Sequence, residues 1–303
     1  MALPGFVHRR AGRRFLARDG AVLPAHLRAR LGYYYRVPGP FELGDDADDL
    51  PLERLGRQRN YWFDLAEHLR RLPSGLRLHY RFGDSTVPPE RPTIVKARCI
   101  GETSGTSVLL KLNQVRHYVF VRDRRPFASK LDSVVWRGGA RQPHRRQFVE
   151  RWFGHRQGDI GRTDSLPGGE EFRRPYMGID AQLAHKFVLS IEGNDVATNL
   201  KWILSSNSLC LMPRPTKETW FMEGRLEPGV HYVELRDDLE DLADAVARWS
   251  RDTCGAERII QNANAWTRQF QDRRDEDTLA LLVLQRYFAD SGQISLADVD
   301  GSR

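Results

Sequence analysis

The residues best suited to chemistry follow apolar runs that have the length of buried strands. One such run covers residues 187–191, and Glu192-Gly193-Asn194 comes directly after it. Gly193 permits a tight turn, and Asn194 or Asp195 can cap the helix that helical spacing predicts from there onward. Because the free amides and the dipole of a helix N-terminus favour an anion, this turn is a candidate anion site.

Two polar side chains of the expected helix over residues 195–205 point back toward this turn. These side chains are Thr198 and Lys201. They are expected to point toward the turn because helical side chains lean toward the helix N-terminus. A nucleotide diphosphate fits such a place. An ordinary strand–helix turn stays open as the alternative, because the chain has neither GxGxxG nor GxxxxGK[ST]. In addition, Asp195 repels a phosphate unless it caps the helix.

A second candidate is Asp84, which follows another predicted strand. Residues 75–82 alternate in hydrophobicity and end in Gly83-Asp84-Ser85. Ligands of open α/β sheets collect at the carboxyl ends of strands, so Asp84 is well placed for catalysis. A plain turn is the alternative, because aspartate often begins turns.

An α/β fold has to position these candidates. Apolar runs alternate with helical spacing between residues 187 and 233, which is typical of a wound α/β sheet. Strands are expected at residues 75–82, 93–98, 107–112, 133–136, 187–191, 209–212 and 230–233. Helices are expected at residues 61–72, 143–153, 195–205, 218–223, 237–250, 254–270 and 275–288. Residues 154–180 are rich in Gly, Pro and charge, which predicts a connection between two domains.

Length and composition limit the class of protein. The chain has 303 residues, 40% of them hydrophobic, which allows one large or two medium domains. Its formal net charge is +7, and most basic residues are arginines, which suit phosphate and carboxylate recognition. The three cysteines, Cys99, Cys210 and Cys254, predict a reducing compartment and no disulfide framework. No CxxC or His/Cys cluster indicates a metal site.

Basic charge is concentrated in residues 1–40, which contain eight arginines and one acid, Asp19. The sequence shows neither the apolar core of a signal peptide nor a run long enough to span a membrane, so a cytoplasmic location is expected. The basic segment is either an edge that contacts anionic lipid at the inner membrane face or a solvated arm. Net charge also leaves a nucleic-acid-binding protein as an alternative, although no such motif is present and no nucleic acid is expected.

The most specific pattern lies in residues 186–234. Its marked residues, in order, are Lys186-Phe187, Gly193, Lys201, Ser208, Leu226, Pro228 and Val230-His231-Tyr232. In spacing and residue type they resemble glycosyltransferase family 90. The stretches GNDVATNLKW, SSNS and KETWFMEG, which begin at residues 193, 205 and 217, are similar to the bacterial lipopolysaccharide branch in particular. The resemblance extends more thinly from Arg81 to Phe288.

This resemblance implies a GT-B fold, in which two Rossmann-like α/β domains face each other across a cleft. The expected acceptor-side domain covers residues 1–155, and the expected nucleotide-sugar-binding domain covers residues 156–274. Residues 275–303 are then a helix that crosses back to the first domain and a flexible tail. The implied reaction is an inverting transfer from a UDP-type nucleotide-sugar donor to a hydroxyl of a glycan or glycolipid, such as lipopolysaccharide core or capsule. No cofactor and no metal are implied.

The resemblance also implies roles for individual residues. Asp84 matches the family's catalytic aspartate and is expected to be the general base. Arg137 and Gly138 match an aromatic-Arg-Gly motif of the donor cleft, so Arg137 and Lys201 are expected to hold the donor phosphates. The other expected donor-binding residues are Gly193, Asn194, Thr198, Asn199 and, as a ribose contact, Glu218.

The chain departs from the family pattern at two positions. Animal members carry basic residues where this chain has Glu192 and Asn199. The phosphate clamp is therefore expected to differ, with Arg137 or Arg174 as compensation. These departures leave an inactive transferase-like scaffold open as a further alternative.

Overall fold

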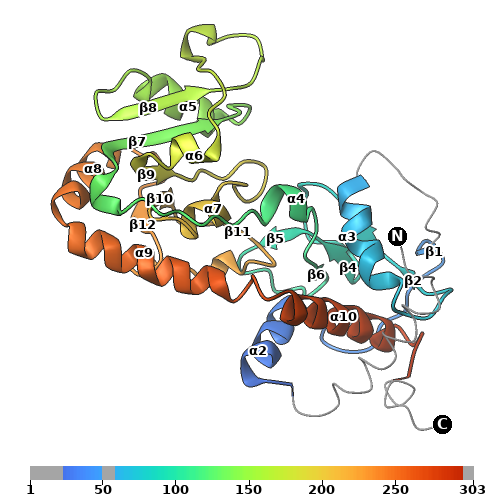
Figure 1. Ribbon diagram of the computed structural model, residues 1–303. Coiled ribbons are helices and arrows are strands. Elements are labelled where there is room, and N and C mark those ends of the chain that lie inside the picture. Colours follow the sequence, from blue (N-terminus) through green and yellow to red (C-terminus); the bar gives the residue numbers. More distant parts are fainter. Residues whose placement is uncertain (1–22, 50–58, 296–303) are drawn as a thin grey trace, which may run out of the picture. The chain divides into compact units, whose positions relative to one another are not determined.

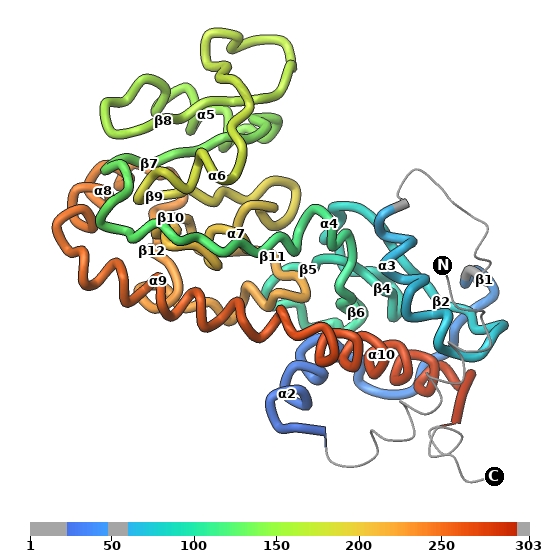
Figure 2. Tube along the Cα trace, viewed as in Figure 1, coloured from blue at the N-terminus to red at the C-terminus, as the bar shows by residue number. Residues whose placement is uncertain are grey.

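The computed structural model describes residues 23–49 and 59–295, in which the chain forms two compact units (Figure 1). Unit 1 combines the described parts of Met1–Val115 and Asp272–Arg303 with the short segment Lys217–Met222. Unit 2 consists of Arg116–Thr216 and Glu223–Gln271. The chain thus passes between the units after residues 115, 216, 222 and 271, which can be followed along the colour gradient of Figure 2.

Unit 2 is built on a parallel five-stranded sheet with the order β12-β10-β9-β7-β8 (Figure 1). The strands are β7 (Leu131–Gly138), β8 (Gly158–Arg162), β9 (His185–Leu189), β10 (Leu209–Pro213) and β12 (Val233–Leu235). Near-continuous apolar runs form β9 and β10, because strands covered on both faces have no side that faces water. The sheet confirms the predicted α/β class.

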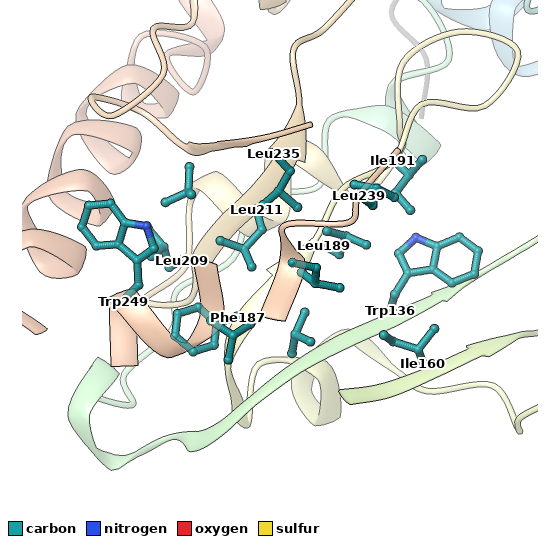
Figure 3. Packing of buried hydrophobic residues seen from close by; sticks show 14 of the residues in the cluster. Trp136, Ile160, Phe187, Leu189, Ile191, Leu209, Leu211, Leu235, Leu239 and Trp249 are labelled. Atoms are coloured by element: carbon teal, nitrogen blue, oxygen red, sulfur yellow. The ribbon is translucent and has the colours of Figure 1, made fainter. Parts of the chain in front are cut away.

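One face of this sheet carries the main hydrophobic core of unit 2 (Figure 3). Alternate strand residues such as Trp136, Phe187 and Leu211 share this face and are at most 2% exposed. Each large side chain buried in this way contributes about 1.5–3 kcal/mol, so the layer holds the strands in register. The helices that contribute to the cluster are α5 (Pro143–Trp152), α8 (Leu242–Arg251) and α9 (Thr253–Arg268).

The winding of the chain reverses between β7 and β9. From β7 the chain continues through α5 to β8, on one side, whereas from β9 it continues through α7 (Leu200–Leu204) to β10, on the other. Right-handed crossovers therefore place α5 and α7 on opposite faces of the sheet. The loops that leave the carboxyl ends of β7 and β9 diverge, which creates a topological switch point, where open α/β sheets bind ligands.

Unit 1 contains a smaller parallel sheet with the order β3-β4-β6. Its strands are β3 (Tyr80–Arg81), β4 (Thr93–Val95) and β6 (Ser107–Leu109). Two antiparallel pairs accompany it: β1 (Asp48–Asp49) with β2 (Arg77–Leu78), and β5 (Ala97–Cys99) with β11 (Lys217–Thr219). Helix α10 (Arg273–Asp290) packs against α2 (Ala25–Tyr34) and α3 (Arg59–Leu69). The short helices of the chain are α4 (Gln114–His117), α6 (Ile179–Gln182), η1 (Phe127–Ser129), η2 (Glu170–Phe172) and η3 (Glu223–Arg225).

Three predictions of local structure are wrong. The helix expected over residues 218–223 is instead strand β11 and a turn, because β11 pairs with β5 and Trp220 is fully buried in unit 1. The helix expected over 195–205 is only α7, since turns fill residues 193–199. The strand expected over 230–233 begins only at Val233, after a turn in which Gly229 N–H bonds to the Tyr232 carbonyl.

The region expected to connect two domains contains a strand. Within residues 154–180, β8 pairs in parallel with β7 and extends the sheet of unit 2. The structure therefore divides after residue 115, whereas the sequence places a boundary at 155, because β7 and α5 share a core with the strands that follow them.

Some expectations concern residues outside the described ranges. Most of the basic N-terminal segment precedes residue 23, so the expected contact with anionic membrane lies outside the described residues. The same holds for the expected flexible tail beyond residue 295. Among the helices of the described ranges, none combines the length and the apolar character needed to cross a bilayer.

Candidate functional site

Asp84 lies in the turn after β3, at the carboxyl edge of the small parallel sheet of unit 1. The turn depends on Gly83, whose φ of 103° is a conformation that residues with a Cβ rarely adopt. The Asp84 side chain is 34% exposed, so its carboxylate is open to solvent or to a ligand. This is the placement that the sequence predicts for it.

One partner of Asp84 is Lys96, which follows the neighbouring strand β4. Because β3 and β4 run in parallel, with Arg81 opposite Val95, both side chains arise at the same edge of the sheet. Lys96 Nζ donates to Asp84 Oδ1 at 2.6 Å, and the lysine side chain is only 1% exposed. Its ammonium also lies 5.8 Å from the centre of the Tyr61 ring. The lysine thus holds the carboxylate in place and stabilises its ionised form.

At the switch point of unit 2, one guanidinium ties the two diverging loops together. Arg145, from the first turn of α5, donates from Nη1 to the Gly139 carbonyl at 3.2 Å, in the loop after β7. Its Nη2 and Nε donate to the carbonyls of Ile191 and Glu192 at 2.5 and 2.9 Å, in the loop after β9. These bonds use three of the five N–H groups of the guanidinium. Arg145 therefore sets the spacing between the two loops.

The glycine at position 193 makes room for this arginine. A Cβ atom at Gly193 would lie 3.2 Å from Arg145 Nη2, tighter than ordinary van der Waals contact, and no positive φ is involved. Burial, followed by the nearby Arg116, lowers the pKa of Arg145 below its ordinary value, although Asp195 and Glu192 oppose this shift. The switch point thus holds a partly desolvated positive charge, which an anion would stabilise.

Glu192 links the loop after β9 to the loop after β10. Its Oε1 accepts from the Thr216 amide at 3.0 Å and its Oε2 accepts from the Thr216 hydroxyl at 2.6 Å. On the other side, Asn194 Oδ1 accepts from Gln142 Nε2 at 2.9 Å. The loop is therefore held by side-chain contacts, and the helix expected to begin beside Gly193 begins only at Leu200. Donor binding by Gly193 and Asn194 stays a prediction.

Lys201 lies away from solvent, in α7. Its Nζ donates to Glu223 Oε1 at 2.5 Å, and both side chains are 0% exposed. Asn199, the N-cap residue of α7, bonds instead to the end of β9, where its Nδ2 donates to the Leu189 carbonyl at 3.0 Å. Thr198 is half-buried in the turn before the helix. Phosphate contacts by these residues stay predictions, and for Lys201 such a contact requires the buried ion pair to break.

Arg137 is also engaged by a carboxylate within unit 2. Its Nη2 donates to Asp159 Oδ1 at 2.6 Å, and its side chain is 5% exposed. Gly138, the last residue of β7, accepts at its carbonyl from the Thr163 amide at 3.0 Å. Arg174, expected as a compensating cation, lies with its guanidinium 4.5 Å from the centre of the Phe153 ring. Arg145, in contrast, lies between the loops of the switch point.

Glu218 is a buried residue of unit 1. Its Oε1 accepts from Arg98 Nε at 2.7 Å, and its Oε2 accepts from the Tyr33 hydroxyl. The side chains of Arg98 and Glu218 are 1% and 2% exposed. Burial and the adjacent Glu218 raise the pKa of Tyr33 above its ordinary value. A ribose contact by Glu218 stays a prediction, since both carboxylate oxygens already have partners within this unit.

Two residues of the site were not expected from the sequence. Lys96 interrupts the apolar run Thr93–Ala97, and a lysine inside a buried strand signals a nearby carboxylate. Arg145 gives no comparable signal, because it lies beside Arg146 on a helix whose exposed positions are rich in arginine. Within the described residues no group of three or more His, Cys, Asp or Glu side chains is arranged to hold a metal ion.

Comparisons with known proteins agree on one family. Residues 108–287 match the family model described as glycosyl transferase family 90. The chain is 44% identical over 270 residues to the O-glucosyltransferase LpsA of Dichelobacter nodosus, an alignment that covers 88% of this chain and 85% of that protein. It is also 27% identical over 191 residues to the uncharacterized protein 027R of Frog virus 3 (isolate Goorha), covering 60% of this chain and 18% of that protein. The family match includes the whole sheet of unit 2 and begins after Asp84.

Proposed function

The chain belongs to glycosyltransferase family 90, and we propose that it transfers a sugar from a UDP-linked donor to a hydroxyl of a bacterial surface glycan. One observation carries this proposal: the 44% identity over 88% of the chain to a bacterial protein named O-glucosyltransferase LpsA. Glucose is therefore the first donor sugar to test, and lipopolysaccharide core is the first acceptor. Nucleic-acid binding, the alternative left open by the net charge, has no support from these similarities.

In this proposal Asp84 is the general base. The acceptor hydroxyl oxygen attacks the anomeric carbon, the bond from that carbon to the diphosphate oxygen breaks, and the hydroxyl proton passes to the carboxylate. This direct displacement inverts the anomeric centre. The 34% exposure of Asp84 and its ion pair with Lys96 support the role, because a base must be both accessible and ionised. A positioned base contributes about 10²–10⁴-fold to such a step.

The proposed place of the donor diphosphate is the switch point of unit 2. Ligands of open α/β sheets bind where the strand order reverses, and here the reversal lies between β7 and β9. Arg145 is the side chain that we assign to the charge of the leaving diphosphate, since it is partly desolvated and keeps N–H groups beyond its three carbonyl bonds. This assignment replaces the clamp expected from Arg137 and Lys201, whose cations are engaged by Asp159 and Glu223.

The GT-B arrangement is part of the same proposal. In this arrangement one Rossmann-like domain supplies the general base and the other holds the nucleotide sugar. The positive charge of Arg145 also makes a divalent cation unnecessary for the leaving group. The proposed reaction therefore needs no metal.

The experiment that tests this function combines a binding and a transfer measurement. The purified chain is titrated with UDP, GDP and CMP while its thermal unfolding is followed, and UDP alone is expected to stabilise it. A ligand at about 100 times its dissociation constant adds about 2.7 kcal/mol. UDP-glucose and other UDP-sugars are then incubated with delipidated lipopolysaccharide core, and transfer is read by mass spectrometry.

The variant Asp84→Asn separates the base from the rest of the site. It keeps the shape of the side chain but removes the proton acceptor, so transfer is expected to fall about 10²–10⁴-fold while UDP binding is retained. Asp159→Asn, a carboxylate change in unit 2, is a matched control that should retain most of the activity. Full activity of Asp84→Asn would exclude the residue as the base, and failure of every nucleotide to bind would contradict the proposed function as a whole.

A further inference from the structure

A second candidate site lies in unit 2, away from the switch point. It is an open pocket of about 440 Å³, between the segment that precedes η1 and the segment that contains α6. The first of these segments contributes three arginines to the lining, Arg122, Arg124 and Arg125. Ile179, Asp180 and Leu183 line it on the other. The pocket therefore combines cationic walls with apolar side chains.

Two of these arginines are accessible to a ligand, whereas the side chain of the aspartate between them is buried. Asp123 points inward, where its side chain is 4% exposed and its Oδ2 accepts from Lys130 Nζ at 2.5 Å. Arg122 and Arg124, on either side of it, are both exposed. Asp123 is thus neutralised by Lys130 and does not compensate the arginines that flank it.

The wall charge of the pocket is accordingly positive. Arg125 is paired, since its Nη2 donates to Asp180 Oδ1 at 2.7 Å. Among the residues that the structure describes, no carboxylate lies within ion-pair distance of Arg122 or Arg124. The pocket holds one Arg–Asp pair and two further guanidinium groups, and guanidinium groups match the oxygens of a phosphoryl group in geometry and charge.

The backbone that carries these arginines is held before any ligand arrives. Asn207, in the turn before β10, donates from Nδ2 to the carbonyls of Asp123 and Arg125 at 3.1 and 3.0 Å. The Val121 amide donates to Ser205 Oγ at 3.0 Å. Because these bonds hold the segment at both ends, binding of a ligand loses less conformational entropy than the ordering of a flexible loop would.

The pocket is not a part of the proposed donor site. Its residues precede β7 and β9, so they lie at the amino-terminal edge of the sheet, whereas the switch point lies at the carboxyl-terminal edge. A strand of five residues, such as β9, spans ~16 Å. A ligand in this pocket therefore occupies a site separate from the loops that Arg145 joins.

We propose that this pocket is a second anion site, which binds a phosphoryl group through Arg122 and Arg124. The phosphoryl group comes either from a soluble phosphate compound or from the headgroup of an anionic lipid. In both cases the two guanidinium groups supply the charge, Arg125 supplies part of the wall, and the apolar residues contact the carrier of the phosphate.

The test compares two double variants of the full chain that lose the same charge. Arg122→Gln with Arg124→Gln removes the pocket cations, whereas Arg258→Gln with Arg268→Gln removes two exposed arginines of α9. Each protein is titrated with inorganic phosphate and pyrophosphate by calorimetry in a phosphate-free buffer. Each is also sedimented with phosphatidylcholine vesicles that contain or lack phosphatidic acid. The midpoint of thermal unfolding verifies that both variants fold.

We expect only the variant Arg122→Gln with Arg124→Gln to lose affinity for the phosphate probes, by about tenfold or more. The reason is that a hydrogen bond to a charged group contributes roughly tenfold to a binding constant. A loss seen with phosphate or pyrophosphate identifies a soluble ligand, and a loss seen only with phosphatidic acid vesicles identifies a lipid headgroup. Equal binding by the two variants, or no binding of any probe to the unaltered chain, would overturn the proposal. UDP affinity is not expected to change in either variant, so failure of the donor proposal would be seen separately.

Discussion

Replacing Lys201 by methionine distinguishes a structural lysine from a phosphate-binding one. Lys201 and Glu223 form an ion pair of 2.5 Å whose side chains are both 0% exposed. Methionine keeps much of the side-chain volume but removes the ammonium group that Lys201 presents to the buried Glu223 carboxylate. Removing one partner of a buried pair costs about 3–5 kcal/mol. The structure therefore predicts a large loss of stability from this single change.

The loss can be expressed as a change in the unfolding midpoint. For a unit of this size 1 kcal/mol corresponds to about 2–4 °C, so Lys201→Met is expected to lower the midpoint by ~6–20 °C. Differential scanning calorimetry of the full chain measures it. The matched control is Lys186→Met, since Lys186 and Asp132 form a pair of 3.3 Å whose side chains are 12% and 57% exposed. A pair open to water is worth about 0–1 kcal/mol, so the control should change little.

The double variant Lys201→Met with Glu223→Leu completes the test. It removes both charges and is expected to recover most of the lost stability, because an apolar pair often replaces a buried ion pair without cost. UDP affinity of the folded single variant, measured at low temperature, should stay within about twofold of the unaltered chain. An unchanged midpoint together with a lost affinity for UDP would refute this reasoning and would assign Lys201 to the donor phosphates.

Three further predictions concern the switch point, metal dependence and pH. Arg145→Lys keeps the charge but replaces the three donor nitrogens of the guanidinium by one, which cannot reach the three carbonyls from the same positions. UDP affinity should therefore fall by about tenfold or more in calorimetry. Unchanged affinity would show that the tie between the loops does not shape the donor site. Transfer should persist in EDTA, because in the proposed reaction Arg145 supplies the positive charge at the leaving group. Activity that vanishes and returns with manganese would contradict this. Burial lowers the pKa of His68 to about 4. Between pH 6.5 and 4 the unfolded chain therefore binds a proton at His68 that the folded chain does not bind. The free energy of unfolding should fall as the pH drops through this range. His68→Leu should show a shallower decline over this window, and an identical slope in the two proteins would remove His68 as a cause.

Parts of the fold follow from local sequence. The apolar runs at residues 187–191 and 209–212 predict β9 and β10 to within two residues at each end, because strands buried on both faces are apolar along most of their length. Pro143 and the spacing behind it predict α5, since proline suits the first turn of a helix. Gly83 and Asp84 predict a turn at the end of β3 for the same local reason. Where conformation depends on neighbours along the chain, the prediction agrees with the structure.

Other features depend on residues that are distant in the sequence. Residues 218–223 have helical spacing in isolation, yet Lys217–Thr219 is a strand because β5 of unit 1 offers it backbone partners more than a hundred positions away. The helix after Gly193 is short because the side chains of Gln142 and Arg145 and the backbone amide of Thr216 hold residues 192–194 outside a helix. No local pattern records such partners.

The sequence by itself determined the family, the parallel sheet and the position of Asp84 at a strand end, because these depend on residue order and on local backbone preference. The tertiary structure decided which charges meet. It pairs Lys201 with Glu223 and Arg98 with Glu218, across separations of 22 and 120 residues, and it brings Arg145 to the carbonyls of both switch-point loops. The physical reason is that a buried charge must find a partner in space, and the fold alone specifies which partner is near.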